Sequence, residues 1–254
     1  MYVRRCTMAN FGDDLNMPLI KSISGESLVG INQSFPNQNN EIVYLVIGSV
    51  LQWADRNSIV WGAGYMSPNS RMKEKPQKIC AVRGRLTREQ LLKQGFDCPE
   101  TYGDPALLYP RCYTPDANKR FKLGIMPHYV DQQAPVLNKF RGMPEVLFMN
   151  ARDPVNKIVD DIRSCERIAS SSLHGLIVAD AYGIPSLWIK LSDKVLGDGF
   201  KFRDYFSSVG RRNDKPLVMD ESIGMESILD SFEEYRIEID LDRLWKACPF
   251  RNEK

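Results

Sequence analysis

Three consecutive serines and a histidine offer the clearest chemistry in this sequence. Ser170, Ser171 and Ser172 end a short apolar stretch typical of a buried strand, and His174 follows at the start of a helical pattern. The free N–H groups and positive dipole at a helix start bind anions, and one serine hydroxyl can cap them. An imidazole there titrates where proton transfer needs it, so the pattern predicts an anion site with an acid–base group. A structural histidine that binds a backbone carbonyl is the alternative.

The elements that must position these residues alternate between short apolar runs and helical patterns, as in α/β proteins. Thr87 and Gln90 form a capping-box pattern and Gly95 a left-handed stop, which predicts a helix over 88–94. The expected strands are 27–31, 42–47, 59–61, 78–82, 121–126, 146–149, 167–170 and 186–191. The other expected helices are 135–140, 154–165, 173–182, 222–235 and 240–247. Prolines indicate a linker near 110–120, so we expect two doubly wound halves, with one large sheet as the alternative.

The composition is that of an ordinary globular protein. The 254 residues include 34 Lys+Arg and 32 Asp+Glu, a formal net charge of +2, and 43% are hydrophobic. These values exclude a disordered or fibrous chain, and the near balance of charge argues against a dedicated nucleic-acid binder. The six cysteines lack metal-ligand or redox spacing, so we expect reduced thiols and no zinc site. No signal peptide and no apolar run of about 20 residues is visible, which predicts a cytoplasmic protein.

Several blocks of the sequence, taken in order, resemble the polysaccharide pyruvyltransferase family. The longest is SSSLHGLIVADAYGIPSLWIKLSD at 170–193. The others are NFGDDL (10–15), IGSVL (47–51), WGAG (61–64), RGRLTREQL (83–91), GDPALL (103–108), MPHYVD (126–131) and DGFKFRDYFSSVGR (198–211). One block alone carries little weight, whereas the ordered set is specific and covers most of the chain.

The resemblance implies a compact GT-B-like arrangement of two Rossmann-like domains with a cleft between them. We assign residues 1–115 to an N-terminal domain on the acceptor side and residues 116–254 to a C-terminal domain on the phosphoenolpyruvate side, with C-terminal helices that pack back on the first domain. The implied reaction transfers the enolpyruvyl unit of phosphoenolpyruvate to two hydroxyls of a sugar in a surface-polysaccharide precursor. It gives a pyruvate ketal and phosphate, and we expect no cofactor and no metal.

Phosphoenolpyruvate carries a phosphate and a carboxylate, and the planar fork of arginine matches both. Some members of the family have an arginine just before the Leu-His pair, where it contacts phosphoenolpyruvate, but this chain has Ser172. Arg83 lies in the block that matches an arginine position of the family, so we expect it to supply the missing charge. A structural ion pair is the alternative for Arg83. The expected donor-binding residues are Arg83, Ser171, Ser172 and Leu173, with Arg85 and Lys190 as weaker candidates.

The implied reaction also needs proton-transfer groups, and the positions of the histidines and acids in the sequence suggest candidates. We expect His174 to carry protons during the transfer. His128 follows a predicted strand and either assists the donor site or packs against Tyr129 without a chemical role. Asp13 and Asp14 open a helix, where an acid favours the dipole; one of them is expected in the cleft, where it accepts from or deprotonates the sugar. We assign catalysis to His174 and Asp14, and substrate binding to His128 and Asp13.

Three other motifs have simpler explanations. WGAG is the first part of a dinucleotide fingerprint, but Ser67 stands at its third glycine, and close packing explains the glycines equally well. Asp104, between a glycine and a proline, is expected to form a turn rather than to act as a base. The run from Lys201 to Tyr205 could hold a sugar or an anionic lipid headgroup, although an amphipathic helix is the simpler explanation.

Two other functions remain open at the level of sequence. A GT-B glycosyltransferase with a nucleotide-sugar donor would have the same fold. A non-catalytic sugar-binding relative would explain why Ser172 replaces the arginine. For the leading hypothesis the expected partners are phosphoenolpyruvate and a sugar acceptor on a lipid-linked oligosaccharide, with no nucleic acid. That acceptor places the protein in the cytoplasm, at most peripherally at the inner face of the cell membrane.

Overall fold

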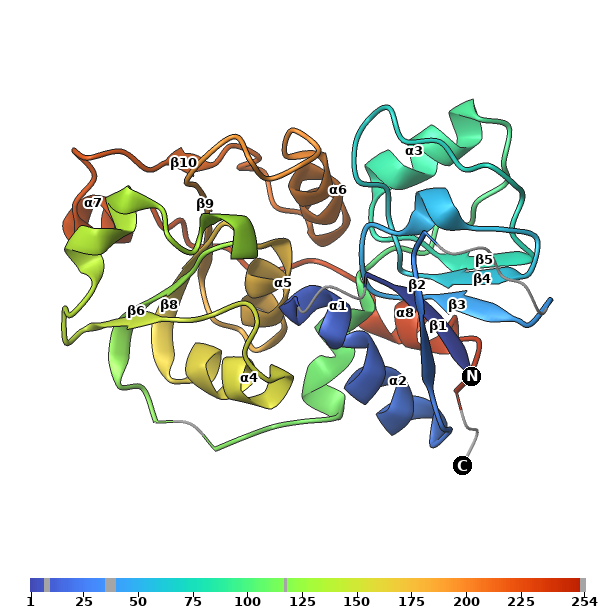
Figure 1. The fold of residues 1–254 in the computed structure, drawn as a ribbon, viewed down its shortest axis with the longest axis horizontal. Coiled ribbons are helices and arrows are strands. Elements are labelled where there is room, and N and C mark those ends of the chain that lie inside the picture. Colours follow the sequence, from blue (N-terminus) through green and yellow to red (C-terminus); the bar gives the residue numbers. More distant parts are fainter. Residues whose placement is uncertain (7–9, 35–39, 117, 252–254) are drawn as a thin grey trace.

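Two parallel sheets form the framework of the computed structural model, which describes residues 1–6, 10–34, 40–116 and 118–251. Each sheet has five strands and belongs to its own lobe (Figure 1), in the orders β2-β1-β3-β4-β5 and β10-β9-β8-β6-β7. All the strand pairings described are parallel. The prediction of two Rossmann-like α/β domains is confirmed, and the alternative of one large sheet is wrong.

The first sheet contains one strand that the sequence pattern did not reveal. Its strands are β1 (Tyr2–Arg5), β2 (Val29–Asn32), β3 (Val43–Leu45), β4 (Ser58–Trp61) and β5 (Lys78–Ala81). The helices of this half are α1 (Phe11–Asp14), α2 (Asn16–Ser24) and α3 (Arg85–Lys93), with short 3-10 turns η1 (Leu51–Trp53) and η2 (Pro105–Arg111). β1 has two arginines in four residues and occupies the second position of the sheet, where Val3 alone is fully buried and apolar. Such a short polar strand lacks the apolar run on which the prediction depends.

The start of α3 differs from the prediction. The helix begins at Arg85, three residues early, and no capping box forms. Instead Asp204 accepts from the Thr87 N–H at 2.8 Å and from the Thr87 hydroxyl at 2.7 Å. This cap comes from a segment more than a hundred residues away, so no local pattern could indicate it. The predicted stop is confirmed, because Gly95 has a φ of +83°.

The second sheet follows the predicted order closely. Its strands are β6 (Phe121–Met126), β7 (Val146–Phe148), β8 (Cys165–Ser170), β9 (Ser186–Lys190) and β10 (Leu217–Val218). The helices are α4 (Val155–Arg163), α5 (Leu173–Ala181), α6 (Phe200–Val209), α7 (Met225–Asp230) and α8 (Leu241–Lys246), with 3-10 turns η3 (Tyr129–Asp131) and η4 (Pro135–Phe140). The predicted helix at 135–140 is therefore a 3-10 helix. The strand β10 lies outside the predicted elements, whereas α6 contains the helix expected for the run from Lys201 to Tyr205.

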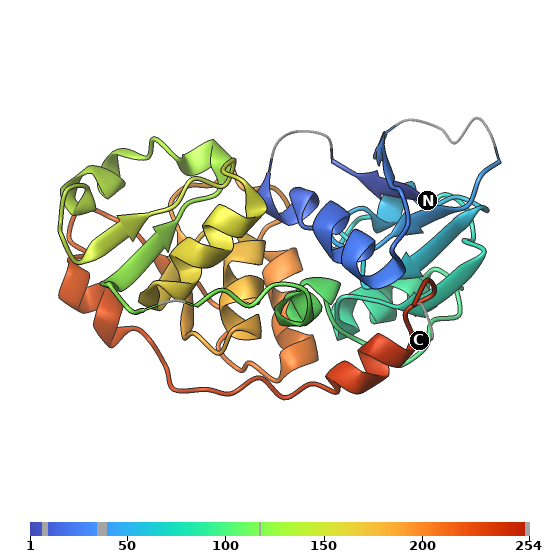
Figure 2. The ribbon, with the colours of Figure 1, turned by 90° about the horizontal axis from the view of Figure 1, so that it is seen from below.

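The two lobes are joined by more than the predicted linker. The chain crosses between them before β6 and crosses back after α7 (Figure 2), and α8 ends against the first lobe. There the Trp61 indole donates to the carbonyl of Leu244 at 2.9 Å, and Phe250 packs edge-on against Trp61. In the other direction, the N–H of Phe11 in α1 donates to the carbonyl of Ala151 at 2.7 Å. A domain boundary at 115/116 stays a prediction, although the strands of the two sheets fall on either side of it.

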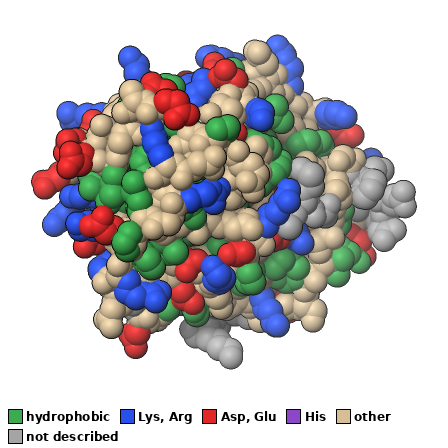
Figure 3. All heavy atoms as spheres, turned by 60° about the vertical axis from the view of Figure 1, so that its left-hand side comes forward, with side chains coloured by type: hydrophobic (Ala, Val, Ile, Leu, Met, Phe, Trp, Pro, Cys, Tyr) green, Lys and Arg blue, Asp and Glu red, His purple; other side chains and the backbone are tan. Residues whose placement is uncertain are grey.

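Charge is distributed without a single dominant sign on the face seen in Figure 3, where acidic and basic side chains are interspersed. In the part of the chain that the structure describes, the helices are too short and too polar for any of them to cross a bilayer.

Candidate functional site

Some of the predicted site residues of the two domains lie together where the two lobes join. His128 follows the carboxyl end of β6, and Ser171 follows the carboxyl end of β8 and leads into α5. From the first domain, α1 packs against α4 and α5 in the middle of the molecule (Figure 1). Open parallel sheets bind their ligands at this edge. The junction is therefore the candidate active site.

His174 lies on the first turn of α5 and is 9% exposed. Its Nε2 atom is 3.4 Å from Oδ2 of Asp104, a fully buried carboxylate that belongs to the first half of the chain. Neither atom has a hydrogen-bond partner among the described residues. A carboxylate behind a histidine can orient the ring and stabilise its protonated form. This arrangement fits a proton carrier held between two domains.

Two local contacts hold this pair in place. Oδ1 of Asp104 accepts from the N–H of Ala106 at 3.0 Å and starts η2, so the predicted turn is present as well. Gly12 lies so close to His174 that a Cβ atom there would be 1.9 Å from Nδ1 of the ring. The glycine in the NFGDDL block is thus explained by the imidazole that packs against it.

Asp13, rather than Asp14, is the carboxylate near His174. Asp13 is 9% exposed and accepts from the Asn10 side chain at 2.9 Å. Burial raises its pKa, while the hydrogen bond from Asn10 and the charge of His174 oppose that shift. Asp14 instead forms an ion pair with Arg5 at 2.6 Å and is about one-third exposed. The structure favours Asp13 as the cleft carboxylate, and a catalytic role for Asp14 stays a prediction.

Arg83 is fully buried and makes three polar contacts inside the protein. Its Nε donates to Oδ2 of Asp204 at 2.9 Å, and its Nη atoms donate to the Ser49 hydroxyl at 2.9 Å and the Tyr65 carbonyl at 2.6 Å. A Cβ atom at Gly64 would lie 2.5 Å from the guanidinium carbon, so packing explains this glycine of WGAG. The structural ion pair, our alternative, is the contact present. Donor binding by Arg83 stays a prediction.

The two weaker cationic candidates each contact a neighbour outside the His174 pair. Arg85 donates to the Ser207 carbonyl at 3.0 Å and lies over the Tyr102 ring. Lys190, at the end of β9, forms an exposed ion pair with Asp193 at 2.5 Å. Neither Arg85 nor Lys190 is described in contact with the His174–Asp104 pair, so the role of these two residues in donor binding also stays a prediction.

The start of α5 is built differently from the predicted cap. Ser172 is the N-cap residue, but its hydroxyl makes no capping hydrogen bond. The hydroxyl of Ser170 accepts from the Ser172 N–H at 3.0 Å, and the Ser171 hydroxyl accepts from the His128 N–H at 2.8 Å. Leu173, the first helical residue, is buried. The serines therefore tie β8 to the loop after β6, and anion binding at this helix start stays a prediction.

His128 packs on Tyr129, with ring centroids 4.4 Å apart, as one of the two alternatives predicts. Its Nδ1 accepts a hydrogen bond from the N–H of Val130 at 3.4 Å. Burial and the nearby charge of Lys201 lower its pKa to about 3. His128 is thus a neutral ring near neutral pH, which leaves His174 as the histidine suited to proton transfer.

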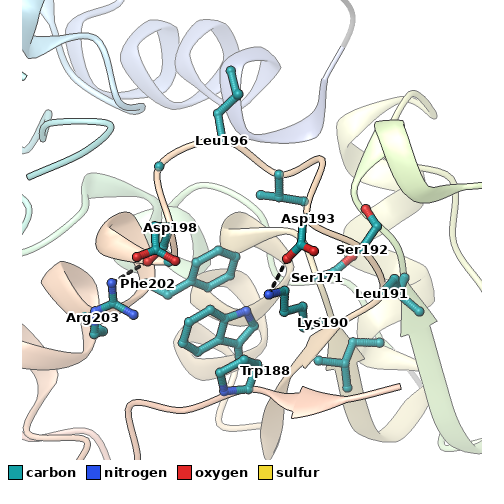
Figure 4. A pocket seen from close by; sticks show the side chains of 15 residues that line it. Ser171, Trp188, Lys190, Leu191, Ser192, Asp193, Leu196, Asp198, Phe202 and Arg203 are labelled. Carbon is teal, nitrogen blue, oxygen red and sulfur yellow. Dashed lines mark hydrogen bonds and ion pairs between the residues drawn. The ribbon is translucent and has the colours of Figure 1, made fainter. Parts of the chain in front are cut away.

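A hollow of about 390 Å³ opens beside Ser171 at the carboxyl end of β9 (Figure 4). Trp188 and Phe202 form a stacked pair in its wall, with centroids 4.4 Å apart and planes 9° from parallel. Its charged lining comprises Lys190, Asp193, Asp198 and Arg203. Two cations and two carboxylates beside an aromatic wall suit a neutral, hydroxyl-bearing ring better than a phosphate.

Lys201 lies at the junction, although the sequence argument named it only within a run that could hold a sugar or an anionic lipid headgroup. It is 8% exposed, and burial together with the charge of Arg83 lowers its pKa to about 8, against the opposing effect of Asp13. An amphipathic helix predicts basic residues in solvent, but α6 is buried on most of its circumference between the lobes. The signal available was the apolar surroundings of Lys201, which lies between Phe200 and Phe202.

Within residues 1–6, 10–34, 40–116 and 118–251, no three His, Cys, Asp or Glu side chains gather as a metal ion would require. None of the six cysteines is in a disulfide, which agrees with the prediction of reduced thiols.

The fold and the site define a two-domain α/β protein in which a buried histidine–carboxylate pair and a buried lysine lie where the two lobes join, the location at which open parallel sheets bind their ligands. A family model described as polysaccharide pyruvyl transferase matches residues 21–193. The chain belongs to this family, and the resemblance inferred from its motifs is confirmed.

Two relatives illustrate the likeness. The chain is 29% identical over 213 residues to protein L143 of Acanthamoeba polyphaga mimivirus, and this alignment covers 81% of this chain and 73% of L143. It is 28% identical over 213 residues to the succinoglycan biosynthesis protein ExoV of Rhizobium meliloti (strain 1021), covering 79% of this chain and 62% of ExoV. Among solved structures, protein KP1_0663 of Klebsiella pneumoniae aligns over 86% of this chain and 92% of its own, with 11% identity and a TM-score of 0.47.

Proposed function

We propose that this protein transfers the enolpyruvyl unit of phosphoenolpyruvate to two hydroxyls of one sugar in a polysaccharide precursor. The observation that carries the proposal is His174, which lies at the start of α5 with its Nε2 facing a carboxylate of the other domain. Family membership supports pyruvyl transfer as the reaction. The donor, the ketal product and a lipid-linked acceptor are the finer parts of this proposal.

The reaction needs three proton movements. A proton added to the methylene carbon makes the neighbouring carbon electrophilic, and the first sugar hydroxyl attacks that carbon and loses its proton. Phosphate then leaves with its bonding electron pair, and the second hydroxyl attacks and loses its proton to close the ketal ring. One of the two hydroxyl protons balances the methylene addition, and the other leaves on phosphate or to solvent.

Two side chains are suited to these movements. His174 carries the proton to and from the donor, since the Asp104 carboxylate lies 3.4 Å from its Nε2 and can orient the ring. Asp13 takes the hydroxyl proton, because burial has raised the pKa of its carboxyl and so made it a better base. The charge-balanced hollow beside Ser171 supports a sugar as the acceptor.

The test is a phosphate-release assay with phosphoenolpyruvate and a panel of terminal hexosides, N-acetylated ones included. The expected product is heavier than its acceptor by pyruvic acid minus one water, which mass spectrometry detects. His174→Gln should abolish both signals, with Lys93→Met, a change on the exposed side of α3, as the matched control. Protection from thermal unfolding by nucleoside diphosphates, with none by phosphoenolpyruvate, would refute the proposal in favour of a glycosyltransferase.

A further inference from the structure

Lys201 presents a physical anomaly at the junction. The residue is only 8% exposed, yet no hydrogen bond or ion pair given for the described residues involves its ammonium group. Its described contact is with the ring of Phe202, whose centroid is 5.6 Å from Nζ. A contact of this kind offsets only part of the cost of taking an ammonium ion out of water. The folded protein therefore holds a cation whose hydrogen-bonding capacity is left for something else.

The surroundings of Lys201 do not neutralise it. Arg83 opposes the positive charge, and His128, which is also nearby, is neutral. Asp13 favours the charge but already accepts from Asn10 and from the N–H of Cys6. The junction therefore combines a buried, weakly compensated ammonium group with a proton-transfer pair, which is the charge pattern of an anion site.

The other candidate cations have partners within the protein. Arg83 binds Asp204, Arg85 lies against Ser207 and Tyr102, and Lys190 binds Asp193. In this chain Ser172 stands at the position where an arginine would precede the Leu-His pair. The positive charge that the donor requires must then come from another element, and α6 delivers Lys201 to the same junction.

We propose that Lys201 forms the anion subsite of this protein and binds the carboxylate or phosphate group of the donor, in compensation for the uncharged Ser172. The inference rests on the proposed function and identifies the residue that binds the donor. It assigns α6, contributed by the second half and packed against α3 of the first, to substrate binding as well as to domain packing.

The test compares Lys201→Met, Lys201→Arg and the exposed control Lys93→Met by calorimetric titration with phosphoenolpyruvate in the absence of acceptor. Lys201→Met should weaken binding about 10- to 100-fold, the range for loss of a hydrogen bond to a charged group. Lys201→Arg should stay within a few-fold of wild type, and Lys93→Met should bind as wild type does. Separate titrations with inorganic phosphate and with pyruvate show which anionic group depends on Lys201.

Thermal unfolding separates this role from a structural one. Methionine has a similar length without the desolvated charge, so Lys201→Met should melt at the wild-type temperature or above it. A large fall in melting temperature would show that the ammonium group has a structural partner and would overturn the proposal. Unchanged phosphoenolpyruvate affinity in Lys201→Met would also overturn it while leaving the proposed function intact, whereas a wild-type protein that binds no phosphoenolpyruvate would overturn both.

Discussion

Replacing Arg83 by methionine should mainly unfold the protein rather than weaken donor binding. The guanidinium and its partner Asp204 are both fully buried, and the pair joins the loop after β5 to α6 of the other lobe. Methionine removes the charge and the bonds to Ser49 and Tyr65 but keeps much of the volume. Asp204 would remain buried with only Thr87 as a hydrogen-bond donor.

The expected magnitude follows from this geometry. Breaking a buried ion pair by removing one partner costs about 3–5 kcal/mol, because the remaining charge is left uncompensated. At roughly 2–4 °C per kcal/mol for a chain of this size, the melting temperature should fall by about 6–20 °C. Arg88→Met is the matched control on α3, since its partner Glu100 is two-thirds exposed and such a pair contributes about 1 kcal/mol or less.

Urea unfolding followed by circular dichroism measures the loss, with Asp204→Asn and the double variant completing a cycle. The double variant should be less destabilised than the sum of the two single variants, because it leaves no buried charge unpaired. If Arg83→Met loses less than about 1 kcal/mol while its phosphoenolpyruvate KM rises more than tenfold, the ion-pair argument is wrong and Arg83 binds the donor.

Three further predictions concern the histidines. Gly12→Ala should lower kcat by about 100-fold because its Cβ would displace the His174 ring, while Gly224→Ala, where nothing lies within 4 Å, should be neutral in a phosphate-release assay. Asp104→Asn should lower kcat more than it raises KM and shift the acid limb of the kcat–pH profile, whereas an unchanged profile would exclude a positioning role for Asp104. His128 should show no imidazole titration by NMR above about pH 5, because its folded-state pKa is about 3. Since its unfolded-state pKa is higher, at about 6.5, protons favour the unfolded chain and stability should fall as the pH drops below about 6.5, less so in His128→Gln.

The fold was largely predictable because its signals are local. Apolar runs locate β6 and β9 within about a residue, and Gly183, with a φ of +67°, follows the end of α5 as expected. The predictions fail where a segment distant in the sequence determines the local structure. Asp204 caps α3 in place of the local capping box, and hydrogen bonding to β2 and β3 makes a strand of the polar segment at Tyr2–Arg5.

The candidate site was predictable in its types of residue more than in their partners. His174 could be identified because strand, serines and helix start follow one another in sequence. The contact of His174 with Asp104 joins positions seventy residues apart, and the choice between Asp13 and Asp14 depends on which way one turn of α1 faces. Sequence spacing carries neither piece of information, because both depend on how the two lobes pack.

Arg83 and Lys201 are neighbouring buried cations with different roles. Arg83 is structural, whereas Lys201 stays available to bind an anion. Asp204 neutralises Arg83 and at the same time caps α3, so this carboxylate fixes α6 against the first lobe. Lys201 lies three residues before Asp204 on the same helix, and no ion pair between the two is described. An effect of Arg83 variants on donor affinity would then act through the position of α6. Lys201→Met should weaken donor binding about 10- to 100-fold without unfolding the protein. Arg83→Met should unfold the protein without a direct effect on donor binding, so comparing stability with affinity assigns the two residues.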